Sequence, residues 1–110
     1  MSPSFERACA LEDLAEEAVL ATEIDGEPVA VVRSQGEVFA ISDICSHADV
    51  PLSEGEVGNC EIECWLHGSR FDLRTGKPIG PPASMPVPVY PVQVIDGEVY
   101  VDMSHPLNLT

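Results

Sequence analysis

The sequence predicts an all-β protein, and two observations support that prediction. Short apolar stretches recur along the chain at roughly the spacing expected of an antiparallel β domain. Ten prolines and eight glycines in 110 residues indicate many turns, which suits sheets better than helices. This length is enough for one hydrophobic core and too short for two. We therefore expect a single domain over residues 1–110.

The first half of the chain reads as strands joined by tight turns. Asp25-Gly26 between two β-type runs is a strong hairpin signal, and Gln35-Gly36 marks a second turn. Leu11–Glu17 is the only helix-like piece, and with under two turns it is marginal as an isolated helix. The expected strands are Phe5–Ala10, Ala18–Ile24, Pro28–Arg33 and Val38–Ile44.

The second half continues the β pattern up to its proline-rich stretch. Two glutamates alternate with apolar residues from Cys60 to Cys64, which is the period of a half-buried strand. Pro78–Pro91 is too rigid and too poor in N–H donors for a central strand. The remaining expected elements are strand Phe71–Leu73, the turn Thr75-Gly76, and a last hairpin of Val92–Ile95, Asp96-Gly97 and Val99–Asp102.

The charge balance narrows the choice of partners. Nineteen acidic residues against five basic ones give a formal net charge of −14. Such a surface repels phosphate backbones and anionic lipids, so we expect neither nucleic acid nor a membrane as partner. Two explanations of the acidity stay open: attraction to a basic protein patch, or solubility alone. The N-terminus shows no signal peptide and no apolar run approaches a membrane span, so a cytoplasmic, reducing location is expected.

Two segments interrupt the β rhythm, and each carries a cysteine and a histidine. Cys45-Ser46-His47 is followed, after sixteen residues, by Cys64-Trp65-Leu66-His67. Together they supply two thiolates and two imidazoles for one metal site. Zinc also takes two cysteines and two histidines, but usually from separate Cys–Cys and His–His pairs. Here each segment brings one of each, which suits a two-iron cluster with both cysteines on one iron and both histidines on the other.

These residues resemble the Rieske [2Fe–2S] motif, Cys45-x-His47 followed by Cys64-x-x-His67-Gly68. The similarity continues through Phe71-Asp72-Leu73-Arg74-Thr75-Gly76, Gly80-Pro81-Pro82 and the last strand Val99-Tyr100-Val101, and so covers nearly the whole chain. The chain resembles the ferredoxin components of multicomponent Rieske oxygenase systems. The resemblance implies a Rieske-type antiparallel β-sandwich with a small cluster-binding subdomain formed by two loops, and Cys45, His47, Cys64 and His67 as ligands of one [2Fe–2S] cluster.

The same resemblance implies a function. We expect a monomeric carrier that takes single electrons from a flavoprotein ferredoxin reductase to a terminal oxygenase, docking transiently through the histidine tip. Trp65 and Leu66, with Pro81 and Pro82, would form an apolar rim there, although ordinary loop packing explains Trp65 equally well. Three alternatives are a small subunit resembling that of NADH-dependent nitrite reductase, a zinc-binding interaction module, and an oxygenase catalytic subunit. The last needs two further histidines and a carboxylate for a mononuclear iron, and only His105 is left.

The ligand set also predicts the redox behaviour. With two thiolates the oxidised site is formally neutral, so adding an electron is easier than in an all-cysteine site. Three features favour the low end of the Rieske range, about −150 mV: the ligand segments have no bridging cysteine, phenylalanine (Phe71) stands where high-potential members have a tyrosine donor, and acidic residues flank the first segment. Ser69 remains as a possible donor to sulfur. Cys9 and Cys60 are expected in the core, and His105 in an exposed tail.

Overall fold

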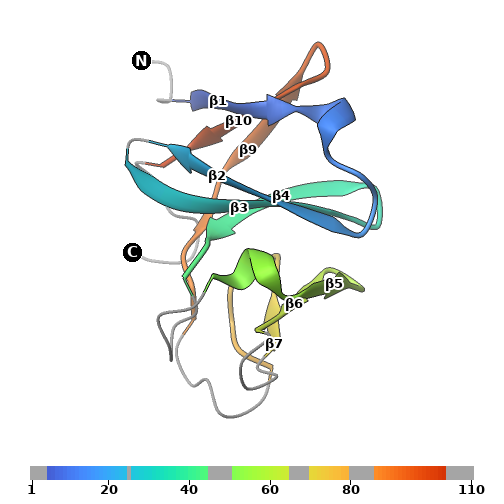
Figure 1. Cartoon of the computed structure of the whole chain (residues 1–110), viewed down its shortest axis with the longest axis vertical. Helices are drawn as coiled ribbons and strands as arrows, with labels where there is room; N and C mark the ends of the chain where they lie inside the picture. Colours follow the sequence, from blue (N-terminus) through green and yellow to red (C-terminus); the bar gives the residue numbers. More distant parts are fainter. Residues whose placement is uncertain (1–4, 25, 45–50, 65–69, 80–85, 104–110) are drawn as a thin grey trace.

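The computed structural model describes residues 5–24, 26–44, 51–64, 70–79 and 86–103 of the chain. Its strands run antiparallel in three sheets, and helical conformation in these residues is limited to two 3₁₀ turns (Figure 1). The all-β prediction is therefore confirmed. The strands are β1 (Phe5–Ala10), β2 (Ala18–Ile24), β3 (Glu27–Ser34), β4 (Glu37–Ser42), β5 (Glu56–Gly58), β6 (Glu61–Glu63), β7 (Arg70–Asp72), β8 (Val89–Tyr90), β9 (Val92–Ile95) and β10 (Glu98–Asp102).

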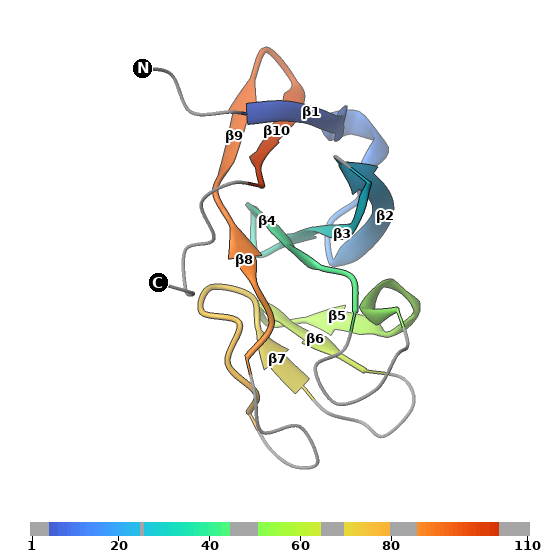
Figure 2. The same ribbon diagram turned by 90° about the vertical axis from the view of Figure 1, so that its left-hand side faces the viewer.

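The three sheets lie one above another, as Figures 1 and 2 show from two directions. The first sheet has the order β1-β10-β9, the second β2-β3-β4-β8 and the third β5-β6-β7. The second sheet lies in the middle, and the third is the layer next to the candidate ligands.

The middle sheet is buried on both faces. Val29–Val32 of β3 is a continuous run with no exposed surface. Val29 and Val31 pack in the core shared with the first sheet, whereas Ala30 and Val32 pack in the core shared with the third. Fully buried strands read as continuous apolar runs instead of alternating ones, so this part of the sequence is explained by two cores that share one sheet.

The helix expected at Leu11–Glu17 is wrong in extent. Only Leu11–Asp13 forms a 3₁₀ turn, because a segment this short cannot offset the cost of nucleating a helix. Leu14 enters the core instead, with 1% of its surface exposed. Beyond it, Glu17 adopts a left-handed backbone (φ 55°), and its carboxylate accepts hydrogen bonds from the Ser34 hydroxyl at 2.9 and 3.0 Å.

The tight turns agree with the sequence. Gln35-Gly36 and Asp96-Gly97 both have positive φ at each central residue, as a type I′ hairpin turn requires. Gly26 also has positive φ, while its neighbour Asp25 lies outside the described residues. A further turn of this kind, Asn59-Cys60 between β5 and β6, was not anticipated from the sequence.

One strand boundary differs from the prediction, and the proline-rich stretch behaves as expected. The strand expected to reach Ile44 ends at Ser42, because Ile44 instead forms a single bridge with Pro51. The proline-rich stretch contributes only Val89–Tyr90, which pairs with β4 at the edge of the middle sheet. An edge position is where strand prolines are tolerated. No helix in the described ranges is long and apolar enough to cross a membrane.

Candidate metal centre

Of the four expected ligands, the structure describes Cys64. It directly follows β6, has no exposed surface and packs in the core between the second and third sheets. Cys45, His47 and His67 lie outside the described residues, as do Trp65, Leu66, Ser69, Pro81, Pro82 and His105. The described parts of the chain contain no group of three or more metal-binding side chains. Described residues on either side of the two ligand segments hold the ends of these segments in place.

The two ends of the first ligand segment, residues 45–50, are held together by contacts of residues 43 and 44 with residues 51 and 52. We call this the first neck. Ile44 and Pro51 on its two sides form an antiparallel bridge. Next to them, the Leu52 N–H donates a 2.8 Å hydrogen bond to the Asp43 carbonyl. Backbone contacts therefore hold the two ends of the segment side by side.

A buried carboxylate reinforces this first neck. Asp43 is 6% exposed, and its side chain accepts hydrogen bonds from the Ser53 N–H at 2.6 Å and the Ser53 hydroxyl at 2.8 Å. Hydrogen bonds to a charged acceptor are stronger than those between neutral groups. Asp43 thus anchors the chain two residues before Cys45.

The two ends of the second ligand segment are held together by the pairing of β6 with β7. We call this pairing the second neck. Glu63 at the end of β6 pairs with Arg70 at the start of β7, and Ile62 pairs with Phe71. Cys64 is the first residue beyond this pairing, so residues 64–69 leave the sheet and return at one place. The side chains of Ile62 and Phe71 are fully buried on the core face of the sheet. Their burial fixes the register of the hairpin, because a one-residue slip would expose them.

The two necks touch each other at Gly55. A Cβ atom at this position would lie 1.6 Å from the Glu63 carbonyl oxygen and 3.3 Å from that of Leu52. Only a residue without a side chain allows the chain leaving the first neck to come this close to the end of β6. The bases of both ligand segments are therefore in direct contact.

A third segment begins at the same place. The Ile79 N–H donates a 2.8 Å hydrogen bond to the Arg70 carbonyl, and Pro78 bridges Phe71. The expected proline loop, residues 80–85, therefore starts beside the second neck. Ile44 and Ile79, which adjoin the first and third segments, are large apolar side chains with 45% and 51% of their surface exposed.

The third sheet separates apolar from charged side chains. Val57, Ile62 and Phe71 lie in one row across the sheet and face the core, whereas Glu56, Glu63 and Arg70 lie in the neighbouring row. Arg70 donates hydrogen bonds to Glu61 and Glu63, and the bond to Glu61 is the largest cause that raises the pKa of its guanidinium. Phe71 is fully buried and offers no hydroxyl to the site, in line with the missing tyrosine donor.

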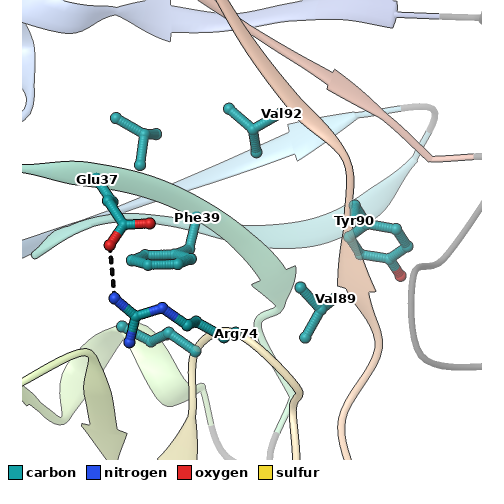
Figure 3. A pocket seen from close by; sticks show the side chains of 8 residues that line it. Glu37, Phe39, Arg74, Val89, Tyr90 and Val92 are labelled. Carbon is teal, nitrogen blue, oxygen red and sulfur yellow. Dashed lines mark hydrogen bonds and ion pairs between the residues drawn. The ribbon is translucent and has the colours of Figure 1, made fainter.

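A crevice is lined mainly by residues of β4, of β8 and of the turn after β7 (Figure 3). It has a volume of about 270 Å³. Arg74 forms an ion pair of 2.5 Å with Glu37 and lies 5.8 Å from the centre of the Phe39 ring. These contacts join the turn after β7 to β4, so the crevice belongs to the packing of the two sheets.

The residues present fit an iron–sulfur cluster. None of the three described cysteines, Cys9, Cys60 and Cys64, forms a disulfide, so the Cys64 thiol is available as a ligand. Cys9 and Cys60 are buried as expected, with 7% and 4% of their surface exposed. Cys64 is buried where the two necks touch. A ligand set of two thiolates and two neutral imidazoles would give the oxidised site a low net charge.

The residues that hold the necks do not stand out in the sequence. Asp43, Ser53, Gly55 and Arg70 were not singled out, because each acts on a partner at least seven residues away in the chain. The signals were slight: one aspartate before the first motif and one glycine behind it. Neither pattern identifies its partner without the fold.

Comparison with known proteins agrees with this architecture. A profile of the Rieske [2Fe-2S] domain matches residues 4–91. The anthranilate 1,2-dioxygenase ferredoxin subunit of Burkholderia cepacia is 40% identical over 94 residues, covering 86% of this chain and 87% of the relative. The ferredoxin of carbazole 1,9a-dioxygenase from Nocardioides aromaticivorans IC177 superposes with a TM-score of 0.84 at 41% identity, over 88% of this chain and 95% of that one.

A third similarity concerns a complex. The structure described as a complex of reduced oxygenase and oxidized ferredoxin in carbazole 1,9a-dioxygenase contains a chain that matches with a TM-score of 0.89 and 33% identity. The match covers 97% of this chain and all of that one. The relatives are thus small proteins of the same length, matched nearly end to end.

The three antiparallel sheets, with a buried thiol where two segment bases meet, define a small all-β domain, and its relatives are electron-carrying ferredoxins. The chain belongs to the Rieske [2Fe-2S] domain family. Within that family it is a ferredoxin, an electron-transfer component and not itself a catalyst, and its cofactor is a Rieske-type [2Fe–2S] cluster.

Proposed function

We propose that this ferredoxin carries one electron at a time from a flavin-dependent ferredoxin reductase to a terminal oxygenase. The cluster would be held by Cys45, His47, Cys64 and His67. The observation that carries the ligand assignment is the contact between the two necks: Gly55 packs on Glu63, next to Cys64. Two segments whose bases touch can aim four side chains at one cluster.

The side chains of this site have distinct tasks. The cluster supplies a one-electron couple whose oxidised form is formally neutral. Cys45 and Cys64 would hold one iron as thiolates, and His47 and His67 the other as neutral imidazoles. Burial of Cys64 excludes water from the sulfur side and so protects the ligand from exchange and oxidation.

Partner docking is proposed at the end of the molecule that carries the ligand segments. Exposed Ile44 and Ile79 adjoin two of the three segments that start there. Apolar side chains of this kind give a small contact area, which suits brief complexes between redox proteins. A ferredoxin of a related system is found with its oxygenase in one structure. We propose that residues 1–110 act as one monomeric domain in the cytoplasm.

The ligand proposal is tested by spectroscopy on the purified protein. A Rieske cluster makes the protein brown and gives a characteristic EPR signal when reduced, whereas a zinc protein is colourless. Cys64→Ala and His67→Ala should each abolish colour and signal, while Cys60→Ala should keep both. Cluster retention in Cys64→Ala would overturn the ligand set.

A second variant tests the charge argument. His67→Cys replaces a neutral ligand by a thiolate and adds one negative charge, so the protein should keep a cluster with a lower reduction potential. A redox titration that shows a rise would contradict the assignment of His67. A wild-type value well above zero would contradict the expected position at about −150 mV.

The carrier role is tested by reconstitution. The protein is combined with candidate reductases and oxygenases, and NADH consumption coupled to product formation is followed. We expect turnover only when all three components are present. A reductase that supports equal turnover without this protein would remove it from the chain of electron transfer.

A further inference from the structure

The outer face of the third sheet carries an unfavourable row of charges. Glu56 and Glu63 stand directly opposite each other across β5 and β6, and like charges in such positions destabilise a sheet. Glu61 adds a third carboxylate one residue pair away and faces Asp72 across β6 and β7. This acidic row begins one residue before Cys64.

Arg70 forms ion pairs with two of these carboxylates, Glu61 and Glu63. Its Nε donates to Glu61 Oε1 at 2.8 Å and its Nη1 to Glu63 Oε1 at 2.8 Å. The guanidinium therefore reaches from β7 across to β6 and holds two carboxylates at once. The three side chains are 41%, 30% and 36% exposed, so the group is only partly screened by water.

The position of Arg70 matters as much as its charge. Glu63 is the residue before Cys64, and Arg70 is the third residue after His67. The backbone of Arg70 pairs with Glu63 on one side and accepts the N–H of Ile79 on the other. It therefore stands where the second ligand segment returns and the proline segment begins.

We propose that Arg70 is a positioning residue for the metal centre, clamping the base of the second ligand segment and shielding the cluster from Glu61 and Glu63. This inference rests on the proposed ligand set. The clamp acts because a planar fork bonded to two carboxylates holds β7 against β6 in one geometry. The shield acts because reduction adds one negative charge, which uncompensated carboxylates nearby disfavour.

The test compares three arginine variants in the cluster-loaded protein. Arg70→Gln removes clamp and shield together, and Arg70→Lys keeps the charge but not the fork. Arg7→Gln is the matched control, since it makes the same charge change at the Arg7–Glu98 pair between β1 and β10 of the first sheet. Circular dichroism confirms the fold of each variant. The readouts are the reduction potential and the rate at which visible absorption is lost in mild denaturant.

We expect Arg70→Gln to lower the equilibrium constant for reduction severalfold and to release the cluster faster, while Arg7→Gln leaves both unchanged. Arg70→Lys should keep the wild-type potential but release the cluster faster. Equal potentials in Arg70→Gln and Arg7→Gln would overturn the shield, and a lysine variant as retentive as wild type would overturn the clamp.

A combined variant identifies the charges responsible. Adding Glu61→Gln and Glu63→Gln to Arg70→Gln removes the carboxylates that the first change uncovers. The group is then neutral, where the wild type carries a formal charge of −1, so the potential should return to the wild-type value or rise above it. A potential that stays low would overturn the role assigned to these glutamates. These outcomes are separate from the proposed function, which fails if the wild-type protein holds no cluster or if turnover does not require it.

Discussion

Gly55 and Gly58 lie three residues apart, yet their surroundings differ greatly. A Cβ at Gly55 would fall 1.6 Å from the Glu63 carbonyl oxygen, whereas a Cβ at Gly58 meets nothing nearer than Glu17 Oε2 at 4.0 Å. Neither glycine has a positive φ. The difference between the two positions therefore comes from the close approach of the two necks and not from backbone conformation.

Gly55→Ala should destabilise the protein by about 1–3 kcal/mol, the usual cost of overpacking, and weaken cluster retention because the necks must separate. Gly58→Ala is the matched control and should change the free energy of unfolding little. Urea denaturation followed by circular dichroism measures both. Equal stability of the two variants would show that the necks separate at no cost.

Asp43 provides a graded test of the first neck. Asp43→Ala removes two hydrogen bonds and leaves the Ser53 N–H without its carboxylate partner, so a loss of about 2–3 kcal/mol in the free energy of unfolding is expected. Ser53→Ala removes only the hydroxyl bond and should cost about 1 kcal/mol. The order is measured by urea denaturation, and a larger loss for Ser53→Ala would contradict the role of the carboxylate.

Tight hairpin turns join β3 to β4 in the middle sheet and β9 to β10 in the first sheet. Gln35-Gly36 and Asp96-Gly97 have nearly the same φ values, 54° and 76° against 52° and 77°. Aspartate and asparagine tolerate the left-handed region better than glutamine. Gln35 is therefore an unfavourable residue for the first position of the β3–β4 turn. Glu17 stabilises it there, because its carboxylate accepts a 3.1 Å hydrogen bond from the Gln35 N–H.

Gln35→Asn should raise the free energy of unfolding by about 0.5 kcal/mol, because asparagine fits the first position of a type I′ turn and the backbone bond to Glu17 is kept. Thermal denaturation with Asp96→Asn as a near-neutral control measures this. A decrease in melting temperature would mean that the Gln35 side chain contributes more than its backbone costs.

The charges of the whole molecule leave it strongly anionic at the surface. All four arginines are engaged by carboxylates, in the pairs Arg7–Glu98, Arg33–Glu16, Arg70–Glu61 with Glu63, and Arg74–Glu37. In the described ranges Lys77 has no ion-pair partner. With a net charge of −14, long-range attraction acts toward a basic partner surface.

Association with the proposed reductase should therefore slow as salt rises. Raising ionic strength from 0.01 to 0.15 M shortens the Debye length from about 30 to about 8 Å, which removes most of the steering between separated charges. Stopped-flow electron transfer at several salt concentrations measures the rate. A rate constant independent of salt would favour the alternative in which the acidity serves solubility alone.

A thiol and a phenol in the core between the first and second sheets predict a loss of stability at alkaline pH. Burial raises the pKa of the Cys9 thiol from 9.0 and that of the Tyr90 phenol from 10.0. The folded state then holds these protons more tightly than the unfolded state, so the free energy of unfolding falls as pH rises past the ordinary values. Denaturation at pH 7.5, 9 and 10 measures the decline, and Tyr90→Phe should reduce it. A rise in stability over that interval would contradict the prediction.

Much of this protein could be anticipated from local patterns. The ligand proposal comes from spacing within two short motifs, and the turns come from the chemistry of residue pairs such as Asp96-Gly97. The alternation from Cys60 to Cys64 correctly indicated a half-buried strand. The helix expected at Leu11–Glu17 failed because a weak local preference lost to the burial of Leu14 and the contacts of Glu17.

Local pattern was sufficient for the all-β class, most strands and the family motif, because β periodicity, turn chemistry and ligand spacing all act over a few residues. It could not show that β3 is buried on both faces, that Gly55 lies against Glu63, or that Arg70 joins β7 to β6. These contacts depend on which distant segments meet, and packing of the three sheets decides that. The bases of the two ligand segments meet because the folded chain, not its motif, places Gly55 beside Glu63.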